Sequence, residues 1–99
     1  MQFIVLGHDG SDADAPARRQ AARPAHLEGA GRRFAAGEWL FAAAILDDDG
    51  QMKGSMIVCD YPTREEIETA WLKSEPYMTG GVWERVEIHR AAVAPATTA

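Results

Sequence analysis

The 99-residue sequence predicts a single domain of the α+β class, because of the order and the length of its apolar segments. Four short runs are rich in β-branched and aromatic residues and are bounded by turn residues, as strands are. Two longer segments begin with residues that favour a helix start. The segments follow the order β-α-β-β-α-β. This order is typical of the ferredoxin-like fold, a four-stranded antiparallel sheet with two helices on one face.

The first strand and the first helix lie within the first 37 residues. Residues 2–7 (QFIVLG) predict a strand that is buried on both faces. A polar turn follows, and Pro16 then lies in the first turn of a helix that runs to about Gly37. Because proline lacks an amide donor and clashes with the preceding turn, we expect Pro24 to kink this helix or to split it in two.

The remaining elements are a hairpin, a second helix and a last strand. We expect them at residues 38–46, 51–61, 63–74 and 82–90, with the hairpin turn at residues 47–50 (DDDG). Thr63 and Glu66 have the spacing of a capping box at the start of the second helix. Ile67, Ala70 and Trp71 form the apolar stripe of that helix.

Length and composition bound the domain organisation. We expect one domain over residues 1–92 and a disordered tail over residues 93–99. No run approaches the roughly 18 consecutive apolar residues of a membrane span. The opening residues, MQFIVLGHDG, contain no basic leader of the kind that signal peptides have, so we expect a cytoplasmic protein.

The charge balance argues against a nucleic-acid partner. The net charge is -5 and the pI is about 5.0, whereas nucleic-acid binding needs a basic surface. Cys59 is the single cysteine, so it cannot form an internal disulfide, and we expect it to be a buried apolar residue. No cofactor and no metal are predicted, because no phosphate-binding fingerprint and no local metal-ligand spacing occur.

Both faces of the predicted sheet carry apolar residues. Alternation places Phe3 and Val5 on one side of the first strand and Ile4 and Leu6 on the other. In the second strand it places Trp39, Phe41 and Ile45 on one side and Leu40 and Leu46 on the other. Two helices cover only one face of the sheet. We therefore expect a homodimer in which the uncovered faces pack against each other.

The first helix concentrates positive charge in this acidic protein. Residues 17–36 contain five arginines and one acid, Glu28. The helical period places five residues in one sector, namely Arg19, Arg23, His26, Ala30 and Arg33. Leu27 and Phe34 fall in the neighbouring sector, and we expect them to face the core. His26 would then lie at the border between core and solvent. The pattern fits a solvated charged face, and it equally fits an anion site with a proton-transferring histidine.

Short motifs then point to a known family. They are Arg23-x-x-His26-Leu27, Gly54-Ser55 in the third strand, and Glu75-Pro76-Tyr77 followed by Gly81. With the opening strand, residues 18–40 and 53–90 resemble the YciI-like (YCII-related) domain family. The resemblance implies a ferredoxin-like dimer of the dimeric α+β barrel group and an active site built on a histidine and an aspartate.

Carried onto this chain, the histidine of the family falls on His26 and the acid falls on Glu75. The sequence departs from the family pattern here, because a Glu-Pro pair replaces the usual Asp-Pro. A second departure is at Ala43 and Ala44, where the family commonly has Gly-Pro.

Two hypotheses for function remain open. In the first, Glu75 orients His26, which acts as a general acid/base in a lyase, isomerase or dehydrohalogenase reaction on a small anionic or phenolic molecule. Substrate-binding roles go to Arg19, Arg23, Tyr77 and Ser55. Some relatives in the broader family are linked to dehydrochlorination of chlorinated aromatics. In the second hypothesis, the protein is a non-catalytic dimeric module that binds a small anion or another protein.

The other polar residues are expected to be structural. His8 and Asp9 end the first strand, where they could approach the site from the same edge of the sheet, but we favour a polar pair that starts a turn. We expect His89 to be a surface residue at the end of the last strand. A metal site made from these two histidines and His26 has no support from local spacing.

Overall fold

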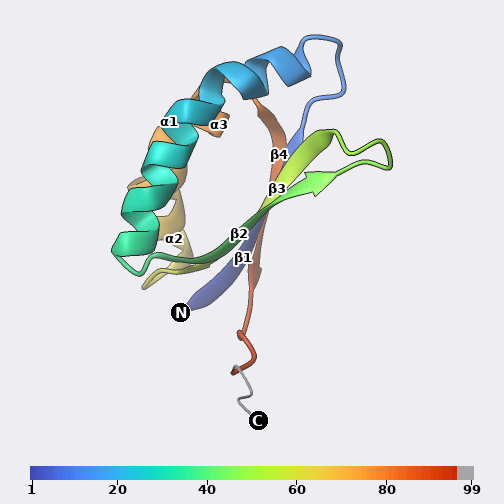
Figure 1. Cartoon of the computed structure of the whole chain (residues 1–99). Helices are drawn as coiled ribbons and strands as arrows, with labels where there is room; N and C mark the ends of the chain where they lie inside the picture. The colour runs from blue at the N-terminus through green and yellow to red at the C-terminus, as the bar shows by residue number, and fades with distance from the viewer. Residues whose placement is uncertain (96–99) are drawn as a thin grey trace.

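A computed structural model describes residues 1–95 of the chain. It contains the strands β1 (Gln2–Asp9), β2 (Trp39–Leu46), β3 (Met52–Asp60) and β4 (Trp83–Arg90), and the helices α1 (Ala15–Ala35), α2 (Arg64–Glu66) and α3 (Pro76–Thr79). A π-helical turn (Ile67–Trp71) and a 3-10 turn (Leu72–Ser74) lie between α2 and α3. Figure 1 shows this order as a colour gradient along the ribbon.

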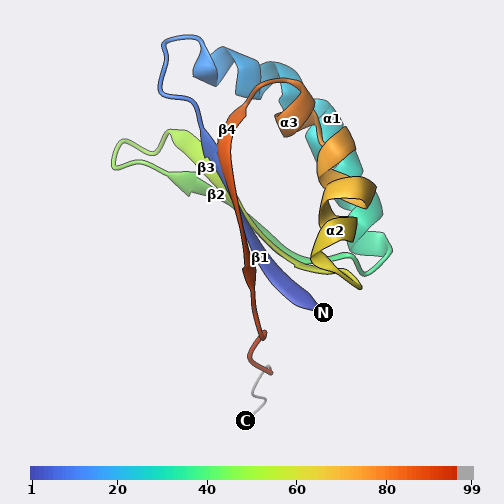
Figure 2. The ribbon, with the colours of Figure 1, turned by 180° about the vertical axis from the view of Figure 1, so that it is seen from behind.

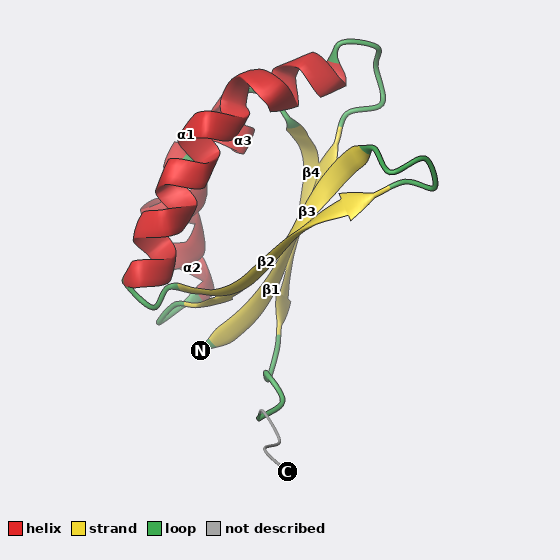
Figure 3. Ribbon diagram, viewed as in Figure 1, coloured by secondary structure: helices red, strands yellow, loops and turns green. Residues whose placement is uncertain are grey.

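The four strands form one antiparallel sheet in the order β2-β3-β1-β4. All the helices lie on the same face of this sheet, as the views from the front and from behind agree (Figures 1 and 2). In Figure 3 the opposite face of the yellow sheet carries no helix. The predicted ferredoxin-like α+β fold is therefore confirmed.

The core lies between the sheet and the helices. Phe3 and Val5 of β1 are buried there, while Ile4 and Leu6 point to the uncovered face, as alternation predicts. Tryptophan and tyrosine side chains are prominent in this core, and the largest of the fully buried residues are Trp39, Trp71 and Tyr77. Cys59 is buried in this core as a free thiol, as predicted.

The prediction that Trp39 and Phe41 share a face of β2 is wrong. A bulge interrupts the register between them, so Trp39 pairs with Cys59 while Phe41 pairs with Val58. Bulges place one extra residue in a strand and thereby shift the alternation of its side chains. Trp39 is buried in the core, whereas Phe41 is 60% exposed on the uncovered face.

Helix α1 runs without a break through Pro24, so the proline does not split it. The helix bends along its length, as Figure 1 shows. The prediction that Leu27 and Phe34 face the core is wrong, because they are 49% and 42% exposed. The inward sector instead centres on Arg19, His26 and Ala30, since small residues and polar side chains on this face leave room for the aromatic core.

The second helical segment is not the regular helix that the sequence predicts over residues 63–74. Thr63 caps it as expected, since its Oγ1 accepts a hydrogen bond from the Glu66 amide at 3.2 Å. The winding then widens, and the Leu72 amide donates to the Ile67 carbonyl in the i to i+5 pattern of a π turn. This turn leaves Ala70 exposed and buries Leu72 beside Trp71, so the predicted stripe is right at Ile67 and Trp71 only.

The last described residues continue beyond β4. The Val93 amide donates to Gln2 Oε1 at 2.7 Å. Of the tail predicted at residues 93–99, residues 96–99 lie outside the described part of the chain. Within residues 1–95, none of the helices combines the length and the apolar character that crossing a bilayer requires. The cytoplasmic location stays a prediction.

Candidate functional site

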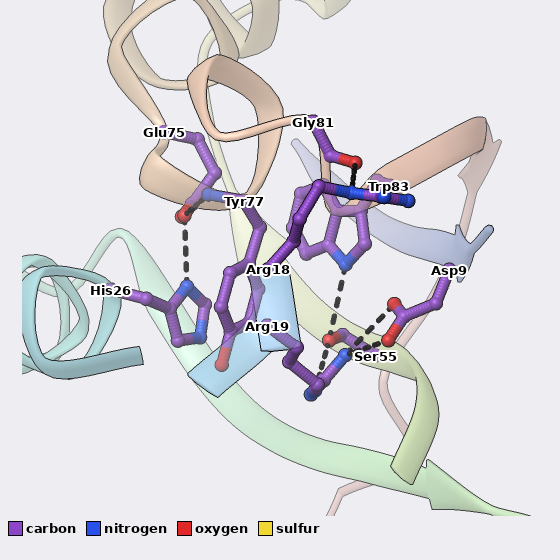
Figure 4. A network of polar contacts seen from close by, with 9 residues as sticks. All are labelled: Asp9, Arg18, Arg19, His26, Ser55, Glu75, Tyr77, Gly81 and Trp83. Atoms are coloured by element: carbon purple, nitrogen blue, oxygen red, sulfur yellow. Dashed lines mark hydrogen bonds and ion pairs between the residues drawn. The ribbon is translucent and has the colours of Figure 1, made fainter. Parts of the chain in front are cut away.

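His26 and Glu75 meet in the space between α1 and the start of α3. The distance from His26 Nδ1 to Glu75 Oε2 is 2.9 Å, and the two residues are 8% and 2% exposed. Figure 4 shows the imidazole pointing at the carboxylate from the opposite helix. His26 is therefore buried, whereas the sequence predicts a position at the border with solvent.

The Glu75 carboxylate has three hydrogen-bond donors. Besides His26, it accepts from Trp71 Nε1 at 3.0 Å and from the Tyr77 amide at 2.8 Å. The bond to Tyr77 has a local cause: Glu75 is the cap residue of α3, and Pro76 occupies the first helical position, where no amide donor is needed. The short helix α3 thus fixes the acid in place.

This environment keeps Glu75 ionised at neutral pH. Burial raises the pKa of the carboxyl, but the hydrogen bonds from His26, Trp71 and the Tyr77 amide outweigh burial and lower the pKa below its usual range. A carboxylate accepts only, so Nδ1 of His26 must be the protonated nitrogen. A neutral His26 then presents Nε2 as an acceptor, available to take up a proton.

Tyr77 holds the plane of the histidine ring. The two rings stack with centroids 3.8 Å apart and planes inclined by 11°, and Arg19 Cζ lies 4.7 Å from the centre of the tyrosine ring. In Figure 4 the phenol ring lies between His26 and Arg19. Burial raises the pKa of Tyr77 and outweighs the opposing charges of Arg19 and Arg23. The phenol therefore stays protonated at neutral pH and can donate.

A second buried network lies beside the first and begins at Asp9. Arg19 Nη1 donates to both oxygens of Asp9 at 2.9 Å, and the two side chains are 7% and 5% exposed. Arg19 Nη2 donates to Ser55 Oγ at 3.0 Å, and Trp83 Nε1 donates to the same oxygen at 3.3 Å. Ser55 Oγ thus accepts two bonds, so its own proton is left for another partner.

Two adjoining cavities open beside these networks. The cavity beside His26, called the inner cavity after its place next to the core, measures about 140 Å³, and its polar wall consists of Arg19, Arg23, His26, Ser55 and Tyr77. Its apolar wall includes Ala42, Ala43, Ala44 and Ile57. The outer cavity measures about 280 Å³ and shares Arg19, Arg23 and Met52 with the inner one. The inner cavity therefore combines hydrogen-bond donors on one side with apolar carbon on the other.

The structure brings the six predicted site residues together. Five of them line the inner cavity, and Glu75 lies behind His26 without lining it. Asp9 is the last residue of β1 and pairs with Arg19, so the less favoured alternative for this residue, an approach to the site from the sheet edge, is the one that the structure shows. The roles of Trp71 and Trp83 as hydrogen-bond donors were not predicted from the sequence. Local spacing could not reveal the contacts of Asp9 and Trp83, because each of them joins different elements of the fold.

The other two histidines lie apart from this site. His8 Nε2 lies 2.6 Å from Glu87 Oε2, and the exposed His89 lies 3.4 Å from the other oxygen of Glu87. Within residues 1–95, no group of three or more His, Cys, Asp or Glu side chains is arranged to hold a metal ion.

Comparison with known proteins connects this geometry to a family. A model of the YCII-related domain matches residues 1–92. The chain belongs to the YCII-related domain family. It is 29% identical over 96 residues to Protein YciI of Escherichia coli O6:H1 and to Protein YciI of Shigella flexneri, a match that covers 89% of this chain and 93% of each relative.

A solved structure shares the fold of this YCII-related domain. It is the 5-chloro-2-hydroxyhydroquinone dehydrochlorinase TftG of Burkholderia phenoliruptrix AC1100, in complex with 2,5-dihydroxybenzoquinone. The TM-score is 0.80, and the match covers 95% of this chain and 96% of TftG. At 18% sequence identity, the likeness shows a common fold.

Proposed function

We propose that this YCII-related domain is an enzyme whose His26–Glu75 pair performs acid/base chemistry on a small anionic or phenolic molecule. The observation that carries the proposal is the 2.9 Å contact between His26 Nδ1 and Glu75 at the wall of a cavity. The complex of TftG, which has the same fold, with a dihydroxybenzoquinone supports a ring-shaped ligand. The reaction class that fits is a lyase, isomerase or dehydrohalogenase reaction.

In this proposal each side chain of the inner wall has a chemical task. Glu75 keeps the proton of His26 on Nδ1, so Nε2 removes a proton from the ligand and returns it at another atom or to a leaving group. The oxygen that becomes negative faces the Ser55 hydroxyl, whose proton has no partner within residues 1–95, and the positive charge of Arg19. Tyr77 keeps the imidazole plane fixed.

The test is replacement of the histidine and assay of turnover. We expect His26→Ala to lower the turnover of an accepted substrate, found in a panel of small phenols and hydroxy acids, by roughly a hundred- to ten-thousandfold. His89→Ala is the matched control, because His89 is exposed and lies on β4. Unchanged turnover in His26→Ala contradicts the proposal. A wild-type protein that binds members of the panel but converts none supports the alternative, a non-catalytic anion-binding module.

We also propose that the protein is a homodimer that packs through the uncovered face of its sheet. This face contains the exposed Phe41 and the partly exposed Ile4, Leu6, Met56 and Val58, which are paired across β2, β3 and β1. Contiguous apolar surface of this kind marks an interface. A two-fold axis would pair the face with itself.

A further inference from the structure

The three basic side chains that line the inner cavity differ in their partners. Arg19 is paired with the buried carboxylate of Asp9, and His26 is paired with that of Glu75. Arg23 lines the same cavity but makes no hydrogen bond and no ion pair within residues 1–95. The guanidinium of Arg19 is therefore matched by a carboxylate of the protein, and the guanidinium of Arg23 is not.

Arg23 lies where the two cavities meet, because it is part of both walls. Its charge reaches the inner site, since it acts on the Tyr77 phenol. The outer cavity also offers the amides of Gln20 and Gln51. The aspartates of the β2–β3 hairpin do not line either cavity, and among residues 1–95 neither cavity wall contains a carboxylate that would repel an anion.

The volumes set the size of the ligand that the inner cavity accepts. A cavity of about 150 Å³ holds one benzene molecule, and the inner cavity measures about 140 Å³. It therefore has room for one six-membered ring, and an acidic substituent on that ring can extend past Arg23 into the outer cavity. The outer cavity measures about 280 Å³, which is ample for a carboxylate and its linker.

Arg19 is a poorer candidate for the anion of the ligand. Both of its terminal nitrogens already donate to Asp9 and Ser55, and its Nε, which has no hydrogen-bond partner within residues 1–95, is buried away from solvent. Arg23 is exposed and has all of its donors free to form the two parallel bonds that a carboxylate accepts from a guanidinium.

We propose that Arg23 binds an acidic substituent of the substrate, so that the substrate class is a single-ring hydroxyaromatic acid, with its ring in the inner cavity and its acid at Arg23, where the two cavities meet. This inference rests on the proposed function, because it requires that the inner cavity bind a phenolic ring. To the proposed function it adds an anionic group on the substrate and the residue, Arg23, that selects for this group.

Two probes that differ only by a carboxylate test the inference: hydroquinone and 2,5-dihydroxybenzoate. Calorimetric titration of the wild-type protein should show at least about tenfold tighter binding of the acid, as a charge-assisted pair provides. Arg23→Gln should lose this preference and keep its affinity for hydroquinone. The preference of the wild type should also shrink as salt is added, since Arg23 is exposed to solvent.

Arg32→Gln is the control, because Arg32 lies on the same helix and pairs only with the exposed Glu28. This variant should keep the tenfold preference. Arg23 is exposed, so its replacement should leave the midpoint of urea unfolding unchanged, and equal unfolding curves make the binding data comparable. If the wild type binds both probes equally, or if Arg23→Gln keeps the preference, the inference is overturned while the phenol site stands. If the wild type binds neither probe, the inference and the proposed function both fall.

Discussion

The ring of Tyr77 lies parallel to that of His26, with 3.8 Å between their centroids. The stack fixes the plane of the imidazole, and the bond to Glu75 fixes its rotation within that plane. Together they determine the direction in which Nε2 points. With the hydrogen bond alone, the imidazole ring could still rotate. Both constraints come from the same short helix, because Glu75 and Tyr77 are the cap and the second residue of α3.

The stability of the protein should depend on the protonation of Glu75. Its pKa in the folded chain lies below the ordinary value of 4.5. The stabilisation is therefore fully present above that unfolded value and is lost as the pH falls through the lower folded value. The difference in the free energy of unfolding between the wild type and Glu75→Gln should be constant above the ordinary value of 4.5 and should shrink as the pH falls below it. Urea titrations at each pH measure it, and a difference that also stays constant below this value would contradict the prediction.

Glu65→Gln serves as the control for that series. Glu65 is exposed in the first turn of α2 and makes no ion pair within residues 1–95. The stability of this variant should follow that of the wild type across the same pH range.

The pair of Asp9 and Arg19 should matter far more to stability than the pair of Asp12 and Arg18. Asp9→Asn leaves the buried charge of Arg19 without its counter-ion, which costs roughly 3–5 kcal/mol of unfolding free energy. Asp12→Asn breaks a two-bond pair with Arg18 at the surface, and it should barely move the unfolding midpoint. Chemical denaturation of both variants tests the contrast. If both variants lost the same unfolding free energy, the burial of Arg19 would not be the reason for the destabilisation in Asp9→Asn.

Gly7 is required by the close approach of Trp83 to β1. A Cβ atom at this position would lie 2.4 Å from the indole ring, so Gly7→Ala must push Trp83 away from Ser55. Overpacking of this kind costs about 1–3 kcal/mol. A fall in the melting temperature and a change in tryptophan fluorescence should accompany it.

Gly31→Ala should have the opposite effect on stability from Gly7→Ala. Gly31 lies inside α1, and a Cβ there meets nothing within 4 Å. Because alanine favours the helix over glycine, the substitution should raise stability by up to about 1 kcal/mol. If both alanine variants were destabilised alike, close approach to Trp83 would not be the reason for Gly7.

Phe41→Asp should separate the proposed homodimer. The side chain is 60% exposed in the single chain, so the change should leave the fold intact while it places a charge in the apolar interface. Sedimentation velocity should show a dimer for the wild type and a monomer for the variant. Met78→Asp, an exposed site on α3 on the helical side, should remain dimeric. A wild-type protein that sediments as a monomer would disprove the homodimer.

The sequence predicts the positions of the helices and strands better than it predicts which of their faces is buried. Glycine and proline bound the strands and the start of α1, and these boundaries depend only on local chemistry. The error at Phe41 arises from a bulge, which depends on the pairing of β2 with β3. The errors at Leu27 and Phe34 arise because the inward face of α1 is polar, whereas an apolar pattern is the usual guide to the buried face.

In the candidate site too, the sequence predicts some features and not others. The pairing of His26 with Glu75, 49 residues apart, follows from the family resemblance and not from periodicity. Arg19 has the helical position that the sequence predicts, but its partner Asp9 lies across a turn on another element. A buried ion pair between a strand end and a helix leaves no periodic pattern in the sequence. Only the folded chain reveals which arginine is already neutralised.

The π-helical turn between Ile67 and Trp71 determines how the segment that follows it is oriented. A turn closed by the Ile67 carbonyl and the Leu72 amide contains one residue more than an α turn. If these residues wound as an ordinary α-helix with no residue removed, the downstream segment would rotate by about 100°. Glu75 would then no longer face the imidazole, although every chemical group of the pair would still be present. The register of one irregular turn, as much as the identity of the acid, decides whether the two groups meet.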